Sequence, residues 1–293
     1  MQPLEHNAPR GLLAVATCVV LWGYSAVAIK MVAASGLVTA FYRLWLAIPA
    51  LWVLLRLLPA TRRPLTGAWA RGCLVGGTLF GLHQLFFFTA LHETSVATVA
   101  LTGALQPALV LLVAPFVFGE RARPRAIGWS VVALGGTAIS VVAAAGSPVW
   151  SLAGDLLAIA NLFAFTAYFL ASRWILFQVA PFEYVVGMTT VSGLMIALAC
   201  VVTGQDLAAP AGVDWLILAS LAIGPGTLGH VLMNWSHRFV TAFAISILLL
   251  AVPVLAAVGA YLWLGEPLAP LQVGGGMIVL FAIGCIVAEQ SET

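Results

Sequence analysis

The chain has 293 residues, of which 62% are hydrophobic and only 8% are charged. About a quarter of the residues of a soluble domain carry charge, because its surface must face water, so this composition excludes an ordinary soluble protein. The formal net charge of +2 says little by itself, although the placement of the charges is informative. We expect an integral membrane protein that lies in the lipid bilayer and binds no nucleic acid.

Ten apolar runs follow one another along the chain, each close to the roughly 20 residues that a helix needs to span a bilayer. The first run, after Arg10, is too long for the apolar part of a cleaved signal peptide, so we interpret it as a retained span. Lipid offers no hydrogen-bond partner to the backbone, so the spans should be helical. The expected spans lie near 11–33, 37–58, 70–91, 96–118, 126–146, 153–177, 183–204, 213–236, 241–264 and 269–288.

The basic residues set the expected orientation. With the N-terminus in the cytoplasm, ten of the twelve Lys and Arg residues fall on the cytoplasmic side, and only Lys30 and Arg43 do not. Cytoplasmic loops of membrane proteins carry such an excess of positive charge. The sequence therefore predicts a multi-pass protein of a bacterial inner membrane with both termini in the cytoplasm. The ten residues are Arg10, Arg56, Arg62, Arg63, Arg71, Arg121, Arg123, Arg125, Arg173 and Arg238.

The two halves of the chain resemble each other. "PALVLLVAPFVFGE" at 107–120 aligns without a gap with "PVLAAVGAYLWLGE" at 253–266, and "LWGYSAVAIK" at 21–30 aligns with "AFTAYFLASR" at 164–173. Each half contains five expected spans, and an odd number forces the second copy to enter the membrane in the opposite direction. Inverted repeats of this kind are typical of secondary transporters, whose site lies near the membrane midplane. We predict an all-α integral membrane fold of ten transmembrane helices, arranged as two inverted five-helix repeats, 1–146 and 147–293, around a central cavity.

These motifs resemble those of a known family. The opening "LWGYSAVAIK", the "FYRLWLA" pattern of the second span, Pro107 and Pro253, and the paired "GE" closures occur in an order similar to that of EamA-type members of the drug/metabolite transporter superfamily. The resemblance covers nearly the whole chain. It implies a ten-helix exporter of small metabolites, often amino acids. The chain resembles aromatic amino acid exporters of this superfamily only in general layout. The resemblance therefore does not imply that this chain exports aromatic amino acids.

Polar residues inside the spans indicate a site, because they are costly unless they face protein or water. Spacings of three and four residues place polar or aromatic side chains on one face of the third, fourth, sixth and eighth spans. The repeat alignment places Trp22 on the corresponding face of the first span. The candidate substrate-binding residues are Trp22, Arg43, Phe80, His83, Gln84, Phe87, Gln106, Asn161, Phe165, Tyr168, His230 and Asn234.

A simpler interpretation of these residues stays open. Ser, Thr, Asn and Gln side chains often connect packed helices without any other role, and aromatic stripes are ordinary core. His83 and His230 fit either a transport path or a neutral imidazole that is hydrogen-bonded to a neighbour. Pro107 and Pro253 fall near mid-span, where the missing N–H favours a kink. We consider both prolines as candidate hinges for alternating access, with a static kink as the alternative.

Arg43 is an anomaly in the second span. At 1.5 Å per residue it lies roughly 10 Å from the outer end of the span. Its side chain could extend back to the outer interface, pair with Glu93, or turn inward and bind the carboxylate of a substrate. The sequence leaves these three possibilities open.

The positions of the acidic residues limit which mechanisms could drive transport. All ten lie in loops or near span ends, so a carboxylate-based proton exchange is not expected. The GxxxxGK[ST] nucleotide-binding motif is absent from the sequence, which disfavours ATP as the driving force. His83 or His230 would carry protons if transport is proton-coupled, and uncoupled export is equally open. We expect no cofactor and no metal site, since the cysteines lack metal-ligand spacing; they are Cys18, Cys73, Cys200 and Cys285.

The sequence predicts a secondary exporter of small metabolites that works as a monomer by alternating access. Aromatic and amide side chains in the expected site favour neutral or aromatic amino acids as the small-molecule substrate. Alternatives are an intramembrane enzyme, a pore, or an exporter of drugs or sugar-like metabolites. An enzyme is disfavoured because "LHETS" at 91–95 lacks the second histidine of HExxH and no GxSxG occurs. A pore is disfavoured because no ring of like charges is evident.

Overall fold

The computed structural model describes the chain as a bundle of helices, and every regular element in the described part is helical. The described residues are 8–57, 66–93, 99, 102–119, 123–144, 151–208, 210–264 and 269–291. The helices are α1 (Ala8–Met31), α2 (Gly36–Leu57), α3 (Gly67–Glu93), α5 (Gln106–Phe118), α6 (Pro124–Ala144), α7 (Leu152–Ile175), α8 (Pro181–Val202), α9 (Asp214–Leu221), the π-helical η2 (Ala222–Gly229), α10 (His230–Ser236), α11 (Ala242–Leu248), α12 (Ala251–Leu264) and α13 (Pro270–Ser291).

Local sequence signals mark several helix ends. The hydroxyl groups of Ser151 and Thr241 accept hydrogen bonds from the backbone N–H groups of Gly154 and Ala244, and so cap α7 and α11. Gly119 ends α5 in the left-handed conformation, with φ of 67°, which glycine adopts without a steric penalty. These signals place the helix ends within a few residues of the expected boundaries.

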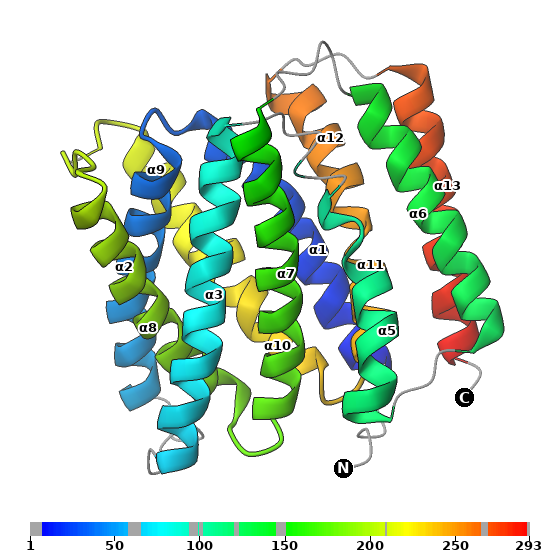
Figure 1. Ribbon diagram of the computed structural model, residues 1–293, viewed down its shortest axis with the longest axis horizontal. Helices are drawn as coiled ribbons and strands as arrows, with labels where there is room; N and C mark the ends of the chain where they lie inside the picture. Colours follow the sequence, from blue (N-terminus) through cyan, green and yellow to red (C-terminus); the bar gives the residue numbers. More distant parts are fainter. Residues whose placement is uncertain are drawn as a thin grey trace.

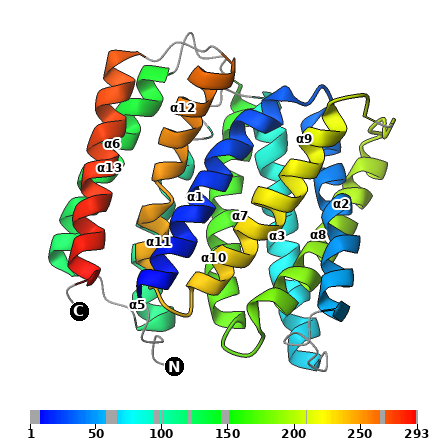
Figure 2. The same ribbon diagram turned by 180° about the vertical axis from the view of Figure 1, so that it is seen from behind.

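The helices stand side by side, and α1 begins at the end of the bundle where α13 finishes (Figure 1). At one edge α6 packs against α13, and at the opposite edge α2 packs against α8 (Figures 1 and 2). Between these edges, α3 packs against α7 and α8, and α1 packs against α12, α10 and η2. Each of these contacts joins the first half of the chain to the second, so the interior of the bundle is built from both halves.

Seven helical stretches in the described part are long and apolar enough to cross a membrane. Two shorter apolar helices, Gln106–Phe118 and Pro270–Ile286, lie within two further expected spans, and α6 overlaps a third. The protein is therefore a helical membrane protein. The count of ten spans and the inverted relation of the halves stay predictions, and the beginning of the expected span 96–118 lies largely outside the described residues.

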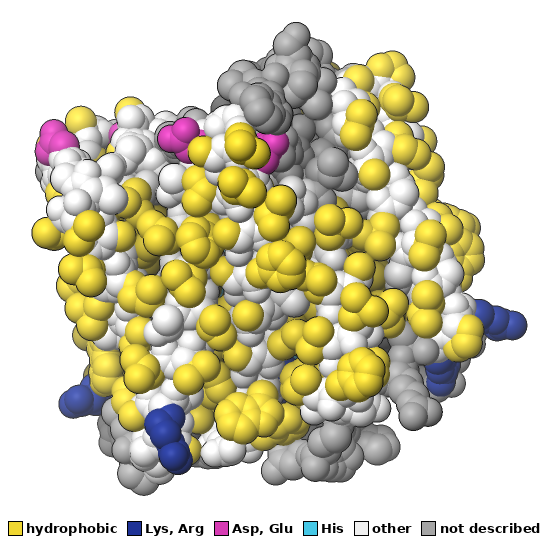
Figure 3. Space-filling view, in the orientation of Figure 1, with side chains coloured by type: hydrophobic (Ala, Val, Ile, Leu, Met, Phe, Trp, Pro, Cys, Tyr) yellow, Lys and Arg dark blue, Asp and Glu magenta, His cyan; other side chains and the backbone are white. Residues whose placement is uncertain are grey.

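The surface is apolar along the bundle and charged at its ends (Figure 3). In that view arginine side chains lie at the end where α1 begins, and acidic side chains lie at the opposite end. Exposed residues such as Phe116 and Phe163 cover the flank and would contact lipid tails. Arg62, Arg63 and Arg121, which also support the expected orientation, lie outside the described residues.

The stretch from Asp214 to Ser236 is interrupted by the π-helical turns of η2. Pro225 explains the interruption, because it has no N–H to bond the carbonyl of Leu221, four residues earlier. In a π-helix the backbone N–H of a residue faces the carbonyl five residues earlier. The carbonyl of Leu221 therefore faces the next residue, Gly226, instead. A Cβ atom at Gly226 would lie only 2.7 Å from the Leu221 oxygen. Glycine is therefore the residue that this close backbone approach allows.

The two candidate hinge prolines lie at helix starts. Pro107 is the second residue of α5 and follows a turn at Ala104 and Leu105, and Pro253 is the third residue of α12 and follows a turn at Leu249 and Leu250. In the first turn of a helix the missing N–H has no intrahelical partner in any case, so proline is tolerated there. Their sequence positions near mid-span thus correspond to breaks between helical segments. Their action as hinges stays a prediction.

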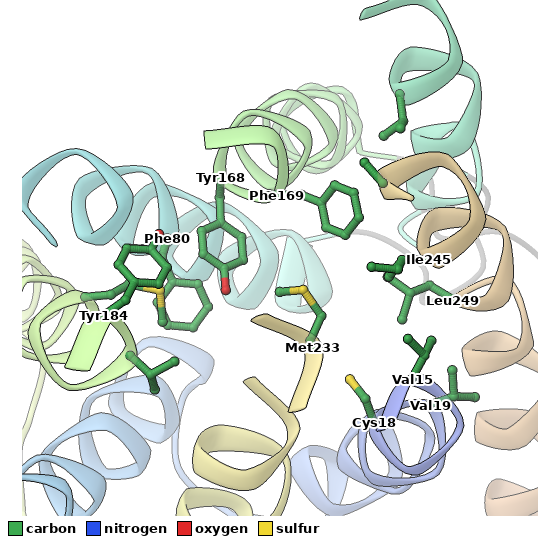
Figure 4. Packing of buried hydrophobic residues seen from close by; sticks show 14 of the residues in the cluster. Val15, Cys18, Val19, Phe80, Tyr168, Phe169, Tyr184, Met233, Ile245 and Leu249 are labelled. Carbon is green, nitrogen blue, oxygen red and sulfur yellow. The ribbon is translucent and has the colours of Figure 1, made fainter. Parts of the chain in front are cut away.

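The core contains large buried aromatic residues where α3, α7 and α8 meet (Figure 4). Phe80, Tyr168 and Tyr184 are almost completely buried, and Met233 packs nearby. A Cβ atom at Gly76 would lie 2.0 Å from the hydroxyl oxygen of Tyr184, so glycine is what lets α3 approach α8 so closely. This packing fixes the position of α3 beside α8.

Candidate functional site

A hydrogen bond between α3 and α7 joins two of the predicted site residues. Nδ1 of His83 lies 2.7 Å from Oδ1 of Asn161. An amide oxygen only accepts, so Nδ1 donates in this arrangement and Nε2 of His83 is left as an acceptor. The pair fixes the orientation of the imidazole ring.

Tyr168, on α7 like Asn161, connects α7 to α10. Its hydroxyl oxygen lies 3.3 Å from Nδ1 of His230 and accepts a hydrogen bond from Nδ2 of Asn234 at 3.2 Å. Nδ2 of Asn234 also donates to the backbone carbonyl of His230 at 2.8 Å. Oδ1 of Asn234 is buried without a hydrogen-bond partner, so its capacity to accept a hydrogen bond is unused.

Aromatic contacts connect these polar residues into one cluster. The His230 ring centroid lies 4.6 Å from that of Phe80 and 5.0 Å from that of Trp22. The Phe165 ring lies 4.7 Å from the ring of His83 and 6.1 Å from the ring of Trp22. We call the set the polar–aromatic cluster: Trp22, Phe80, His83, Asn161, Phe165, Tyr168, His230 and Asn234.

Trp22 reaches η2 as well as the cluster. Its indole N–H donates to the carbonyl oxygen of Pro225 at 3.2 Å. A Cβ atom at Gly229 would lie 2.8 Å from the indole nitrogen, so glycine makes room for the ring. The polar atom of Trp22 is thus used by the backbone of η2, and only its ring is available to the cluster.

Arg43 of α2 turns into the bundle and is buried, with 6% of its surface exposed. Nη2 donates to Oε1 of Gln84 at 2.7 Å, and the guanidinium carbon lies 5.6 Å from the centre of the Phe88 ring. Glu93 is exposed at the end of α3 and is not the partner. Of the three orientations that the sequence left open, extension to the interface and pairing with Glu93 are therefore wrong.

Two further predicted residues occupy different places. Phe87 joins the edge of the cluster, with its ring centroid 5.7 Å from that of His83. Gln106 is buried at the start of α5, and its Nε2 has no hydrogen-bond partner. No hydrogen bond or ring contact between described residues connects Gln106 to the cluster, so its place in the site stays a prediction.

Sequence reasoning missed Phe88, Pro225, Gly226 and Gly229. The "GPG" triplet of 224–226 was the available signal for the break in the eighth span, because proline and glycine both disfavour a regular helix. Phe88 gave no signal, since a phenylalanine in an apolar run is unremarkable by itself. As for metals, the described residues contain no group of three His, Cys, Asp or Glu side chains that could hold an ion.

The arrangement can bind a small molecule that has both polar and apolar parts. Rings from three helices offer flat apolar surfaces, and hydrogen-bonding atoms lie between them. A helical membrane protein with such a cluster inside its bundle has the architecture of a membrane transporter. The sequence model of the EamA-like transporter family matches residues 9–142 and again residues 152–288, so the chain belongs to this family, within the drug/metabolite transporter superfamily.

Named relatives share part of the sequence. The aromatic amino acid exporter YddG of Ancylobacter novellus is 33% identical over 171 residues, which are 57% of this chain and 56% of that protein. The match thus spans little more than half of that relative's length. A probable terminal-alkyne amino-acid exporter of Streptantibioticus cattleyicolor is 28% identical over 74% of this chain and 72% of that protein.

A solved crystal structure supports the fold. It covers 94% of this chain and 96% of its own chain with a TM-score of 0.76, at 23% sequence identity. The protein therefore has the fold of an experimentally determined structure, and its substrate has to be argued from its own residues.

Proposed function

We propose that the protein is a secondary exporter of neutral or aromatic amino acids in the bacterial inner membrane. The observation that carries the proposal is the polar–aromatic cluster, in which side chains of α1, α3, α7 and α10 meet inside the bundle. The names of two relatives, an aromatic amino acid exporter and a probable terminal-alkyne amino-acid exporter, support the same substrate class.

The chemistry of the cluster suits an amino acid. The rings of Trp22, Phe80 and Phe165 would contact an apolar or aromatic side chain over a large area. The unpartnered Oδ1 of Asn234 would accept a hydrogen bond from an ammonium group. The apolar rings and this amide oxygen therefore favour an amino acid over a nucleotide or a sugar phosphate.

Alternating access between the two halves would move the substrate. In this proposal the halves are inverted five-helix repeats that enclose a central cavity, and one chain suffices. The family model matches once in each half, which supports a duplication. The arginines at the end where α1 begins support a cytoplasmic location for that end and for both termini (Figure 3).

Counterflow of labelled amino acids into proteoliposomes tests this function. Wild-type protein should give saturable uptake of phenylalanine or leucine. Phe165→Ala should reduce uptake roughly tenfold, because an aromatic contact in a buried site contributes on the order of 1–2 kcal/mol. Phe163→Ala is the matched control, since Phe163 lies on the same helix with 58% of its surface exposed. Absence of saturable uptake by the wild type, or equal losses in both variants, would contradict the proposal.

A further inference from the structure

No acidic side chain in the described part of the chain pairs with the buried charge of Arg43. Among the described residues its guanidinium makes one hydrogen bond, to the neutral Gln84, and one ring contact, to Phe88. Its Nε atom is buried without any hydrogen-bond partner. A charge removed from water is costly unless an opposite charge compensates for it. Arg43 therefore occupies a position where an added anion would be strongly favoured.

The donor geometry of Arg43 specifies the kind of anion. A guanidinium carries five N–H donors in a planar fork, whereas Gln84 offers it a single amide oxygen. A carboxylate has two oxygens with the spacing that this fork matches, and it supplies the missing negative charge. Gln84 thus accepts one hydrogen bond from Arg43, whereas a carboxylate would accept two and would also balance the positive charge.

Arg43 also borders the polar–aromatic cluster. Gln84 follows His83 directly in the sequence and lies one helical turn beyond Phe80, so it lies on the cluster face of α3. Arg43 reaches this face through its hydrogen bond to Gln84. On its other side, a Cβ atom at Gly226 of η2 would lie 3.7 Å from Cγ of Arg43. An anion at the guanidinium would thus be next to the cluster.

We propose that Arg43 binds the carboxylate group of the transported substrate, and that Gln84 occupies the guanidinium while the site is empty. This inference rests on the proposed function and adds the group that the protein recognises. The apolar part of the substrate lies over the rings of the cluster, and its carboxylate lies between α2 and α3. The residue pair then selects amino acids over amines, amides and alcohols that have the same side chain.

Binding of matched ligand pairs to the purified full-length protein tests this assignment. Phenylalanine is compared with phenylalaninamide, and leucine with leucinamide, because each pair differs only in the carboxylate. Wild-type protein should prefer each acid by roughly tenfold or more, the range expected for one charge-assisted hydrogen-bonded contact. Arg43→Gln should lose this preference through weaker binding of the acid, while its binding of the amide stays near the wild-type value.

Two further variants keep the test decisive if Arg43→Gln fails to fold. Gln84→Glu should weaken binding of the acid by a similar factor, because the new carboxylate would occupy the guanidinium permanently. The same variant should raise the melting temperature of the ligand-free protein by supplying the missing counter-charge. Arg43→Lys should keep a reduced preference for the acid, since lysine retains the charge and loses the fork.

The outcomes separate this inference from the proposed function. If the variants bind the amino acids with unchanged preference over the amides, Arg43 is not the carboxylate site and the exporter function stands. If wild-type protein binds amide and acid equally well, the inference is overturned as well. If wild-type protein binds neither ligand of any pair, both proposals are overturned.

Discussion

Arg43 and Arg173 are both buried, to 6% and 5% exposure, yet their surroundings differ. Nη1 of Arg173 donates to two backbone carbonyls, those of His237 and Val240, and its guanidinium lies 5.4 Å from the centre of the Phe118 ring. Arg43 has one neutral side-chain acceptor and one ring. Each guanidinium lies near a phenylalanine ring, so the two arginines differ in their hydrogen-bond acceptors.

The acceptors indicate different roles for the two cations. The carbonyls that bind Arg173 belong to the connection between α10 and α11, so Arg173 ties the end of α7 to that connection and to α5. Backbone acceptors of this kind persist whether or not a substrate is present. The amide of Gln84 is instead carried on a side chain with several rotatable bonds. A buried arginine held by the backbone belongs to the fold, whereas one held by a single neutral side chain is available to a ligand.

The largest effect should come from breaking the Arg173 contacts. Arg173→Gln leaves buried carbonyls without their charged donor, so we expect a loss of about 3 kcal/mol of stability, the scale seen when one partner of a buried charged contact is removed. The melting temperature in detergent and the yield of monodisperse protein measure it. Arg10→Gln, at an exposed position, is the control. An unchanged melting temperature in Arg173→Gln would remove the distinction between the two arginines.

The second prediction concerns η2, which borders Arg43. In Gly229→Ala the new Cβ atom would lie 2.8 Å from the Trp22 indole nitrogen, so the ring must shift from its observed position beside His230. Overpacking of this kind costs on the order of 1–3 kcal/mol, and we expect transport to fall strongly. Gly224→Ala is the matched control in the same turn, because its Cβ atom would lie at an ordinary 3.6 Å from Leu21. Equal transport by both variants would show that Trp22 need not hold its observed position.

A smaller effect should follow from Tyr168→Phe. The change removes the hydroxyl that contacts His230 and Asn234 and leaves the ring in place. We expect about 1 kcal/mol weaker substrate binding, which is roughly a fivefold change, because one buried hydrogen-bonding group is lost. Binding titration measures the change, with Tyr261→Phe, exposed on α12, as the control. A wild-type affinity in Tyr168→Phe would reduce Tyr168 to a packing residue.

The smallest effect should come from Glu93→Gln. Glu93 is exposed and does not pair with Arg43, so stability should stay within about 0.5 kcal/mol of wild type and binding of the amino acid should be unchanged. Thermal unfolding and ligand titration check both values. A clear loss of the preference for acids over amides would mean that Glu93 acts on Arg43 after all, and would weaken the contrast with Arg173.

Much of the fold was predictable, because hydrophobic run length determines where helices can cross a bilayer. The faces of α3 and α7 were predictable as well, since a regular 3.6-residue period places His83 with Phe87 and Asn161 with Phe165. The eighth span was predicted less well. The periodic argument assumed a regular helix, and Pro225 interrupts it with η2 just before His230.

The sequence by itself determined that the protein lies in a membrane, which residues are buried polar candidates, and that Arg43 has no charged partner within its own helix. Only the tertiary structure decided that His83 bonds Asn161 and that Arg43 bonds Gln84 instead of Glu93. The physical reason is that helix periodicity fixes which side chains share a face, whereas the rotation and approach of packed helices fix which faces meet. Glycines such as Gly76 and Gly229 set those approaches, and their effect depends on the atoms of the opposing helix.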